Sequence, residues 1–118
     1  MKENILGIII VLLFFLLLYL TLPSDEEVRE NNRINFINLS FRGVVYDKFI
    51  DKSEHSFPIV IIKSIEDTIV YKINFARESN SMFDSLNTLD TVYKNRGENV
   101  IYSKRNNAYI KIGPAYFN

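Results

Sequence analysis

The sequence contains no cysteine and no tryptophan, and His55 is its single histidine. Without cysteine the chain can form neither a disulfide nor a thiolate nucleophile, and it cannot carry a lipid on a cysteine. A Ser-His-acid triad would have to use His55, which lies in a charged stretch, and no G-x-S-x-G motif presents a serine for attack. These absences predict a protein that is not an enzyme.

Glycine is also scarce, and the four glycines are scattered, so no glycine-rich loop can cradle a phosphate. Asp47, Asp51, Glu54 and His55 are residue types that bind metals, but their spacing matches neither zinc nor EF-hand sites. The charges cancel, with 14 basic and 14 acidic residues, which removes any general attraction to nucleic acid. We therefore expect no metal, no cofactor, no small-molecule ligand and no nucleic-acid partner.

One hydrophobic run dominates what is present. Residues 5–22 read ILGIIIVLLFFLLLYLTL and carry no charge. As a helix this run would be about 27 Å long, at about 1.5 Å per residue. That length is close to the roughly 30 Å hydrocarbon core of a bilayer. We therefore assign residues 1–22 to a transmembrane helix.

The run could be a retained signal-anchor or a cleaved signal peptide. A signal peptide has a cationic start, an apolar core of roughly 7–15 residues and small residues at the cleavage site. Here Lys2 is balanced by Glu3, the run is longer, and the bulky residues 20–22 stand where small ones are needed. A retained anchor is the favoured interpretation, and cleavage remains the alternative.

The orientation follows from the position of the run. Lys2 precedes it, but Arg29 and Arg33 lie close behind it, so the bias expected from the positive-inside rule is weak. A single hydrophobic run at the extreme N-terminus is typical of an export signal. We therefore expect a single-pass protein of the bacterial inner membrane with its C-terminal domain in the periplasm.

The segment 23–33 (PSDEEVRENNR) is polar, and it is predicted to be a linker or a frayed helical end. From residue 34 onward Ile37, Leu39 and Phe41 alternate with polar residues, which predicts a half-buried strand. Gly43 interrupts this pattern and indicates a bulge or a sharp bend. Further strands are predicted at 59–62, 69–75, 100–102 and 109–112, and Val92 and Tyr93 precede a polar turn.

The periodicity changes between residues 77 and 87. Ser81 and Asp84 form an S-x-x-D capping signature, and Met82, Phe83 and Leu86 share one helical face, which Leu89 would extend. The predicted fold is an N-terminal transmembrane helix followed by a small mainly-β domain over residues 34–118. This domain is a bent antiparallel sheet or partly open barrel of about five strands with one short helix.

The C-terminal third is locally basic, and three tyrosines (93, 102 and 109) are interleaved with its cations. That mixture is typical of a surface that binds an anionic strand, and the ligand could be an anionic glycan, a lipid head group or an acidic partner. The alternative is that the cations occupy turns and outer faces while the tyrosines pack. The candidate contacts are Lys94, Arg96, Tyr102, Lys104, Arg105 and Lys111.

Several short motifs resemble a family of small membrane-anchored or lipoprotein-like envelope proteins of the Bacteroidota. They are Phe41-Arg42-Gly43-Val44-Val45, then Asp51, His55 and Pro58-Ile59-Val60-Ile61, and finally the segment 96–104 (RGENVIYSK). The chain departs from the family at Glu98-Asn99-Val100, where the family has Asp-Ser-Ile, and in having a plain anchor instead of a lipidated cysteine. The resemblance implies a cell-envelope location and brings no activity.

Three Asp-Ser/Thr-apolar triplets are similar to the O-glycosylation acceptors of exported Bacteroidota proteins. The candidate acceptor residues are Thr68, Ser85 and Thr91.

The favoured function is a membrane-tethered, non-enzymatic accessory or interaction domain of the bacterial cell envelope, which binds a protein partner. Tyr116 and Phe117 in the tail, or the 44–46 edge, are its candidate contacts. The alternative is a small subunit of a larger membrane complex, held through its transmembrane helix. Helix contacts in lipid favour small residues, and Gly7 is the only glycine of the run, which disfavours this alternative.

Overall fold

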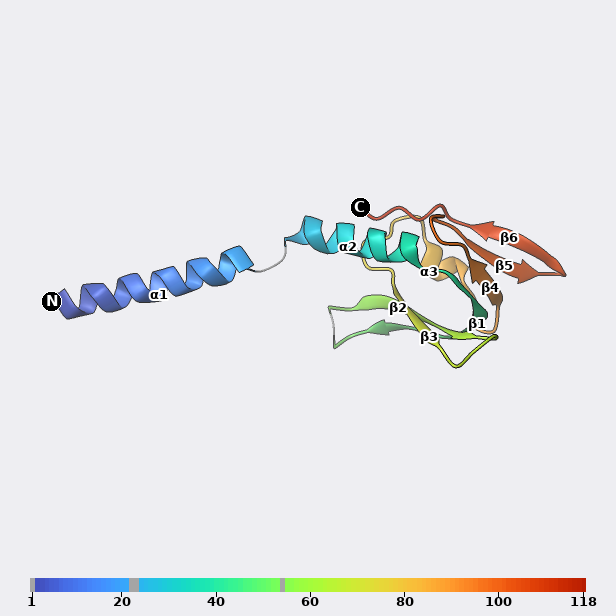
Figure 1. The fold of residues 1–118 in the computed structure, drawn as a ribbon, viewed down its shortest axis with the longest axis horizontal. Coiled ribbons are helices and arrows are strands. Elements are labelled where there is room, and N and C mark those ends of the chain that lie inside the picture. Colours follow the sequence, from blue (N-terminus) through green and yellow to red (C-terminus); the bar gives the residue numbers. More distant parts are fainter. Residues whose placement is uncertain (1, 22–23, 54) are drawn as a thin grey trace.

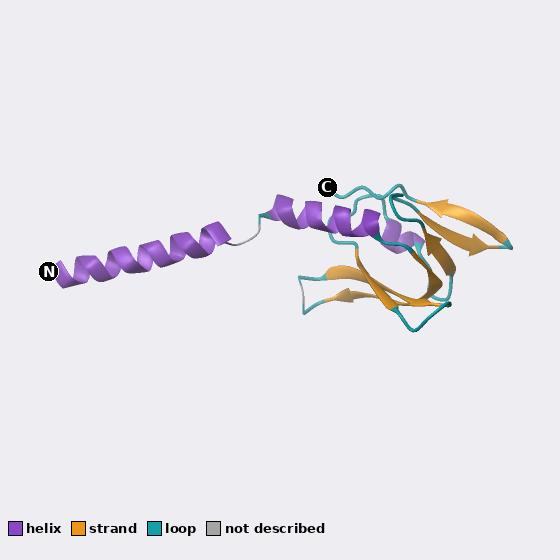
Figure 2. Cartoon of the chain, viewed as in Figure 1, coloured by secondary structure: helices purple, strands orange, loops and turns teal. Residues whose placement is uncertain are grey.

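The computed structural model describes residues 2–21, 24–53 and 55–118. An N-terminal apolar helix is followed by a second helix and a six-stranded antiparallel sheet with one short helix, as Figures 1 and 2 show. The predicted fold class is thereby confirmed. The structure does not describe residues 1, 22, 23 and 54. The end of the predicted anchor, the start of the predicted linker and Glu54, which was considered as a metal ligand, therefore lie outside the described residues.

The helix α1 spans Lys2–Thr21 and projects away from the β domain (Figure 1). Its large apolar side chains are exposed on every side, from 43% at Leu18 to 77% at Tyr19. Among the described residues it forms the one helix that is long and apolar enough to cross a membrane, judged by length and composition.

The helix α2 spans Asp25–Asn38. In the described residues the segment 23–33 is therefore helical from Asp25 onward, which agrees with the alternative of a helical end and not with a linker. The predicted strand from residue 34 is wrong up to Asn38. The polar segment is helical because local contacts stabilise it without a continuous apolar face. The Ser24 side chain caps the helix by accepting a hydrogen bond from the Glu27 N–H at 3.1 Å. Two ion pairs follow along its surface: Arg29 with Glu26, and Arg33 with Glu30.

The C-terminal half of α2 belongs to the domain core. Phe36 is 2% exposed, and its ring lies 5.9 Å from those of Phe75 and Phe117, centroid to centroid. The alternation of Ile37, Leu39 and Phe41 therefore does not come from a strand, since Ile37 lies in the helix and the first strand begins only at Phe41.

The sheet has the strand order β3-β2-β1-β4-β5-β6, and every neighbouring pair is antiparallel. It is an open sheet whose two edges are β3 and β6. The strands are β1 (Phe41–Asp51), β2 (Phe57–Ser64), β3 (Val70–Asn74), β4 (Thr91–Lys94), β5 (Ile101–Arg105) and β6 (Ala108–Ile112).

The central strand β1 is bent, as the sequence predicted, but the bulge is not at the glycine. The pairing register with β2 shifts between Val45 and Asp47, which places the irregularity at Tyr46. Gly43 serves another purpose, because a Cβ at this position would lie 2.2 Å from the carbonyl oxygen of Lys63. Only glycine permits so close an approach of β1 to β2.

The inner face of the sheet carries the hydrophobic core, which is covered by α2, by α3 (Met82–Ser85) and by the C-terminal segment. Met82 and Leu86 are fully buried, as predicted, whereas Leu89 is 78% exposed. The predicted S-x-x-D cap is wrong, because Ser81 has a left-handed backbone and makes no side-chain capping bond. Glu78 replaces it, since its carboxylate accepts a hydrogen bond from the Met82 N–H at 3.0 Å.

Replacement of Phe36 tests whether α2 is part of the domain. Phe36→Ala leaves a cavity between the helix and the sheet, and we expect it to lower the free energy of unfolding by about 3–5 kcal/mol. Ile34→Ala is the control on the same helix, because Ile34 is 42% exposed, and it should cost below about 1 kcal/mol. Urea unfolding followed by far-UV circular dichroism measures both variants. Equal small losses would show that α2 does not contribute to the core.

Candidate functional site

The outer face of the sheet carries a row of four aligned polar and aromatic side chains. The cross-strand pairs are Arg42 with Tyr93, Tyr93 with Tyr102, and Tyr102 with Lys111. The row therefore crosses β1, β4, β5 and β6. Neighbouring strands lie about 4.8 Å apart, so the row is about 14 Å long. The alternate residues of these strands, such as Val92 and Ile101, are fully buried in the core.

A second row runs beside the first on the same face. It contains the pair Val44 and Thr91 and the pair Lys104 and Tyr109. Among the outward strand positions of the two rows there are three cations and no acid. We call the group of Arg42, Tyr93, Tyr102, Lys104, Tyr109 and Lys111 the tyrosine platform.

The rings of the platform are packed against one another. Tyr93 stacks on Tyr102, with centroids 4.7 Å apart and planes 14° apart, and meets Tyr109 edge-on at 4.9 Å. The Arg42 guanidinium lies 5.7 Å from the Tyr93 ring centroid. Because Arg42 and Tyr102 come from the strands on either side of β4, the Tyr93 ring lies between them. This packing holds the platform in one arrangement.

Glu98 fixes the edge of the platform beside β5. Its carboxylate accepts hydrogen bonds from the Asn95 side-chain amide at 3.0 Å and from the Tyr102 hydroxyl at 2.9 Å. These two bonds lower the pKa of Glu98, and the bond to Glu98 raises the pKa of Tyr102. At neutral pH the carboxylate is therefore charged and the phenol is protonated, which keeps the hydrogen bond intact.

Three residues of the predicted anion site lie together on the platform: Tyr102, Lys104 and Lys111. The other members of the platform were not among the predicted contacts; they are Arg42, Tyr93 and Tyr109. The sequence prediction did not include Arg42, because β1 lies far from β4 in the chain and reaches it only through strand pairing. The polar Arg42 next to the apolar Phe41, at the start of the strand, is the local signal that could have pointed to it.

Lys94 does not belong to the site, and its prediction as an anion contact is corrected. It lies on the inner face of β4 and is 1% exposed. Its Nζ donates hydrogen bonds to the carbonyl oxygens of Ile37 at 3.1 Å, Leu39 at 3.0 Å and Asn95 at 3.2 Å. These hydrogen bonds use all three ammonium protons. Lys94 therefore caps the C-terminal end of α2 and does not face a ligand.

Arg105 and Arg96 also lie away from the platform. Arg105 points to the inner side, where it donates to the Asp90 carboxylate at 3.1 Å and to the Ser85 carbonyl. Asp90 also accepts from the Ser103 hydroxyl at 2.9 Å, so this cluster joins the loop after α3 to β5. Arg96 is exposed in the turn between β4 and β5.

The three predicted glycosylation positions differ in accessibility. Thr68 is exposed in the turn between β2 and β3. Ser85 is exposed at the end of α3, where its hydroxyl donates to the Ser81 carbonyl at 2.9 Å. Thr91 is half-buried in β4. Thr68 and Ser85 are therefore exposed at the surface, whereas Thr91 is partly covered.

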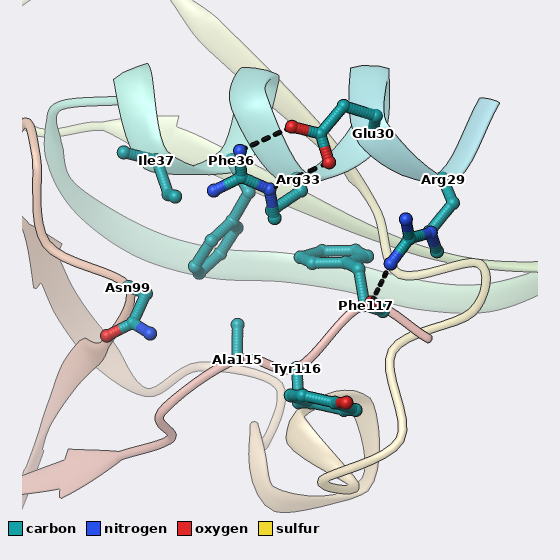
Figure 3. Close-up of a pocket in the computed structure, with 9 residues that line it drawn as sticks. All are labelled: Arg29, Glu30, Arg33, Phe36, Ile37, Asn99, Ala115, Tyr116 and Phe117. Carbon is teal, nitrogen blue, oxygen red and sulfur yellow. Dashed lines mark hydrogen bonds and ion pairs between the residues drawn. The ribbon is translucent and has the colours of Figure 1, made fainter. Parts of the chain in front are cut away.

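A cavity of about 280 Å³ lies between α2 and the C-terminal segment (Figure 3). Arg33 pairs with Glu30, which lowers the pKa of Glu30 and raises that of Arg33. Arg29 pairs with Glu26 and also donates to the Phe117 carbonyl at 3.4 Å. The lining residues are Arg29, Glu30, Arg33, Phe36, Ile37, Asn99, Ala115, Tyr116 and Phe117.

This cavity offers no uncompensated charge, because both of its arginines are paired with glutamates of their own helix. Phe117 is 4% exposed and belongs to the core, so its prediction as a partner contact is wrong. Tyr116 is 58% exposed and remains accessible.

No group of three or more His, Cys, Asp or Glu side chains that could hold a metal occurs in the described part of the chain. Comparison with family models, with curated proteins and with solved structures finds no match to this chain. The functional argument therefore depends on the geometry alone.

The burial of Lys94 makes stability depend on pH. Burial lowers the pKa of Lys94 to about 8, whereas an unfolded lysine titrates near 10.4. Between these values the unfolded chain binds more protons, so the free energy of unfolding should rise with pH, by about 1–3 kcal/mol between pH 8 and pH 10. Urea unfolding at a series of pH values measures this change.

Lys94→Met removes the titrating group and leaves the carbonyls of Ile37, Leu39 and Asn95 without this donor. Its free energy of unfolding should therefore be lower than that of the wild type at each pH, and it should lack the rise between pH 8 and pH 10. Lys52→Met is the matched control, because Lys52 is exposed in the turn after β1, and it should keep the wild-type pH dependence. An equal rise in all three proteins would assign the effect to groups other than Lys94.

Proposed function

We propose that the chain is a single-pass membrane protein of the bacterial cell envelope whose β domain is a non-enzymatic accessory or interaction domain. The observation that carries this proposal is the exposure of α1. No other described part of the chain covers its apolar side chains, which are more than two-fifths exposed throughout Ile5–Leu20. Burial of one such side chain is worth about 1.5–3 kcal/mol, so lipid is the natural environment of this helix.

The connection between the two helices supports a domain held close to the bilayer. α1 ends at Thr21 and α2 begins at Asp25, so only residues 22–24 separate them. Because Phe36 fixes α2 in the core, the anchor continues into the domain through a helix and not through a long linker. The N-terminal end of α2, the end of β1 and the start of β2 lie at the end of the domain nearest α1 (Figure 1), so we place this end nearest the membrane.

The charged side chains of the domain support a binding role and not catalysis. The carboxylate of Glu78 accepts hydrogen bonds from the N–H groups of Asn80 at 2.9 Å, Met82 at 3.0 Å and Tyr116 at 2.7 Å. The Lys48 ammonium donates to the carbonyls of Phe83 and Leu86 at the end of α3. These groups hold loops and helix ends in place. The resemblance to Bacteroidota envelope proteins agrees with the proposed location.

Membrane extraction tests the anchor. The wild-type chain should remain in the membrane pellet after an alkaline carbonate wash, with the mass of the uncleaved chain. Leu12→Arg combined with Leu16→Arg places two charges at the centre of α1, at a cost of about 2.5–3.5 kcal/mol each, and should release most of the protein. Leu12→Ala with Leu16→Ala keeps the helix apolar and should stay in the pellet. A wild-type chain shortened to begin near Ser24 would overturn the proposal.

The absence of cysteine permits a direct test of topology. Thr88→Cys places a single thiol on an exposed turn of the β domain, and Asn4→Cys places one at the start of α1. In intact cells with a permeable outer membrane, a membrane-impermeant maleimide should label Thr88→Cys and leave Asn4→Cys unlabelled. The opposite result would place the β domain in the cytoplasm.

A further inference from the structure

We propose that the tyrosine platform binds a linear acidic polysaccharide. The platform lies on the outer face of the sheet, and no described element covers it. Its exposed cations are Arg42, Lys104 and Lys111, and none of the outward strand positions in its two rows is acidic. Glu98, at the margin, interacts with the charge of Lys111, so the two rows keep a positive charge that is only partly compensated. Charge complementarity therefore points to an anionic occupant of low charge density.

The packing of the rings favours sugars over nucleic-acid bases. Single-stranded nucleic acids bind by stacking their bases on open aromatic faces. Here the Tyr93 ring lies between Arg42 and Tyr102, so its faces are already used. The accessible groups of the platform include the Tyr109 side chain, which is 46% exposed, and the cationic groups of Arg42, Lys104 and Lys111, which are exposed. These groups match a ligand that is rich in hydroxyls and carries carboxylates.

The margins of the platform limit the charge density of the ligand. A polar groove of about 340 Å³ adjoins Arg42 and Tyr93, and Glu66 and Asp67 of the β2–β3 turn also line it. Glu98 lies at the other margin and accepts from Tyr102. Carboxylates at the margins accept hydrogen bonds from sugar hydroxyls but repel closely spaced phosphates. The geometry therefore fits a polysaccharide in which neutral sugars separate the acidic ones.

The shape of the site fits an extended polymer. The first row is about 14 Å long, and it lies on an open sheet face and not in a closed pocket. A polymer can cross four strands on such a surface and contact Lys111, Lys104 and Arg42 through successive units. That this polymer belongs to the cell envelope rests on the proposed function, whereas the binding chemistry rests on the platform alone.

The test uses the purified full-length chain in detergent micelles and hyaluronan, a linear polysaccharide in which acidic and neutral sugars alternate. We expect saturable binding by biolayer interferometry that weakens as salt is added. Hyaluronan with its carboxylates converted to methyl esters should bind at least about tenfold more weakly, a loss of about 1.4 kcal/mol. Equal binding of the ester, or no binding of hyaluronan at micromolar to millimolar concentration, would overturn the proposal.

Matched variants locate the site. Lys104→Gln with Lys111→Gln should weaken hyaluronan binding about tenfold, because both cations lie on the platform. Lys52→Gln with Lys72→Gln removes the same charge from the hairpin turn and from β3, and should change binding less than about twofold. Equal losses in the two double variants would show nonspecific attraction and overturn the site.

Two further measurements separate the remaining outcomes. Tyr109→Ala should weaken binding without changing the charge, since Tyr109 is 46% exposed, and far-UV circular dichroism confirms that each variant is folded. Single-stranded poly(U) is the nucleic-acid comparison, and tighter binding of poly(U) than of hyaluronan would overturn the proposal. Because binding is measured in micelles, a wrong membrane topology would leave it intact, so the two proposals fail independently.

Discussion

The ammonium group of Lys94 is the interaction on which the arrangement of the β domain depends. It lies in the core between α2 and the sheet and donates to the carbonyls of Ile37, Leu39 and Asn95. The Phe36 ring lies 4.8 Å from the ammonium, measured to the ring centroid. Carbonyl groups at the end of a helix need donors when they are buried, and one lysine supplies them at the point where the chain turns from α2 into β1.

The two faces of the sheet carry different kinds of side chain. The inner face is filled by apolar side chains and by polar groups that hold elements together, such as Asp90 with Arg105 and Ser103. The outer face keeps its cations and tyrosines accessible. Since successive residues of a strand point to opposite faces, Lys94 and Tyr93 differ in role although they are neighbours in the chain. The platform lies on the outer face, and we propose that this face binds the ligand.

The proposed anchor joins the domain at the start of α2. The paired arginines of α2 line the cavity between this helix and the C-terminal segment (Figure 3). The turn between β5 and β6 lies at the far end of the molecule (Figure 1). A polymer bound across β4, β5 and β6, as we propose, would therefore lie away from the end of the domain that joins α1.

The sequence by itself determined the elements whose signals are local. The uninterrupted apolar run predicted α1, the continuous β-branched run at 59–62 predicted β2, and alternation from Ile69 to Phe75 predicted β3. Short apolar segments predicted β5 and β6, and the spacing of Met82 and Leu86 predicted α3. The strand β4 was not predicted as a strand. The prediction failed for α2, because capping by Ser24 and ion pairs on the helix surface replace the apolar periodicity that identifies a helix. It also misplaced the bulge, since the need for Gly43 arises from the approach of Lys63 on a separate strand.

Only the tertiary structure decided which cations share a face. The composition of the C-terminal third predicted six contacts, of which strand register places Tyr102, Lys104 and Lys111 together and turns Lys94 and Arg105 inward. Arg42 joins them from β1 through pairing with β4. The sequence specifies the charge and type of each residue, but the face of the sheet on which a side chain lies depends on strand register and burial. Those are set by contacts between segments far apart in the chain.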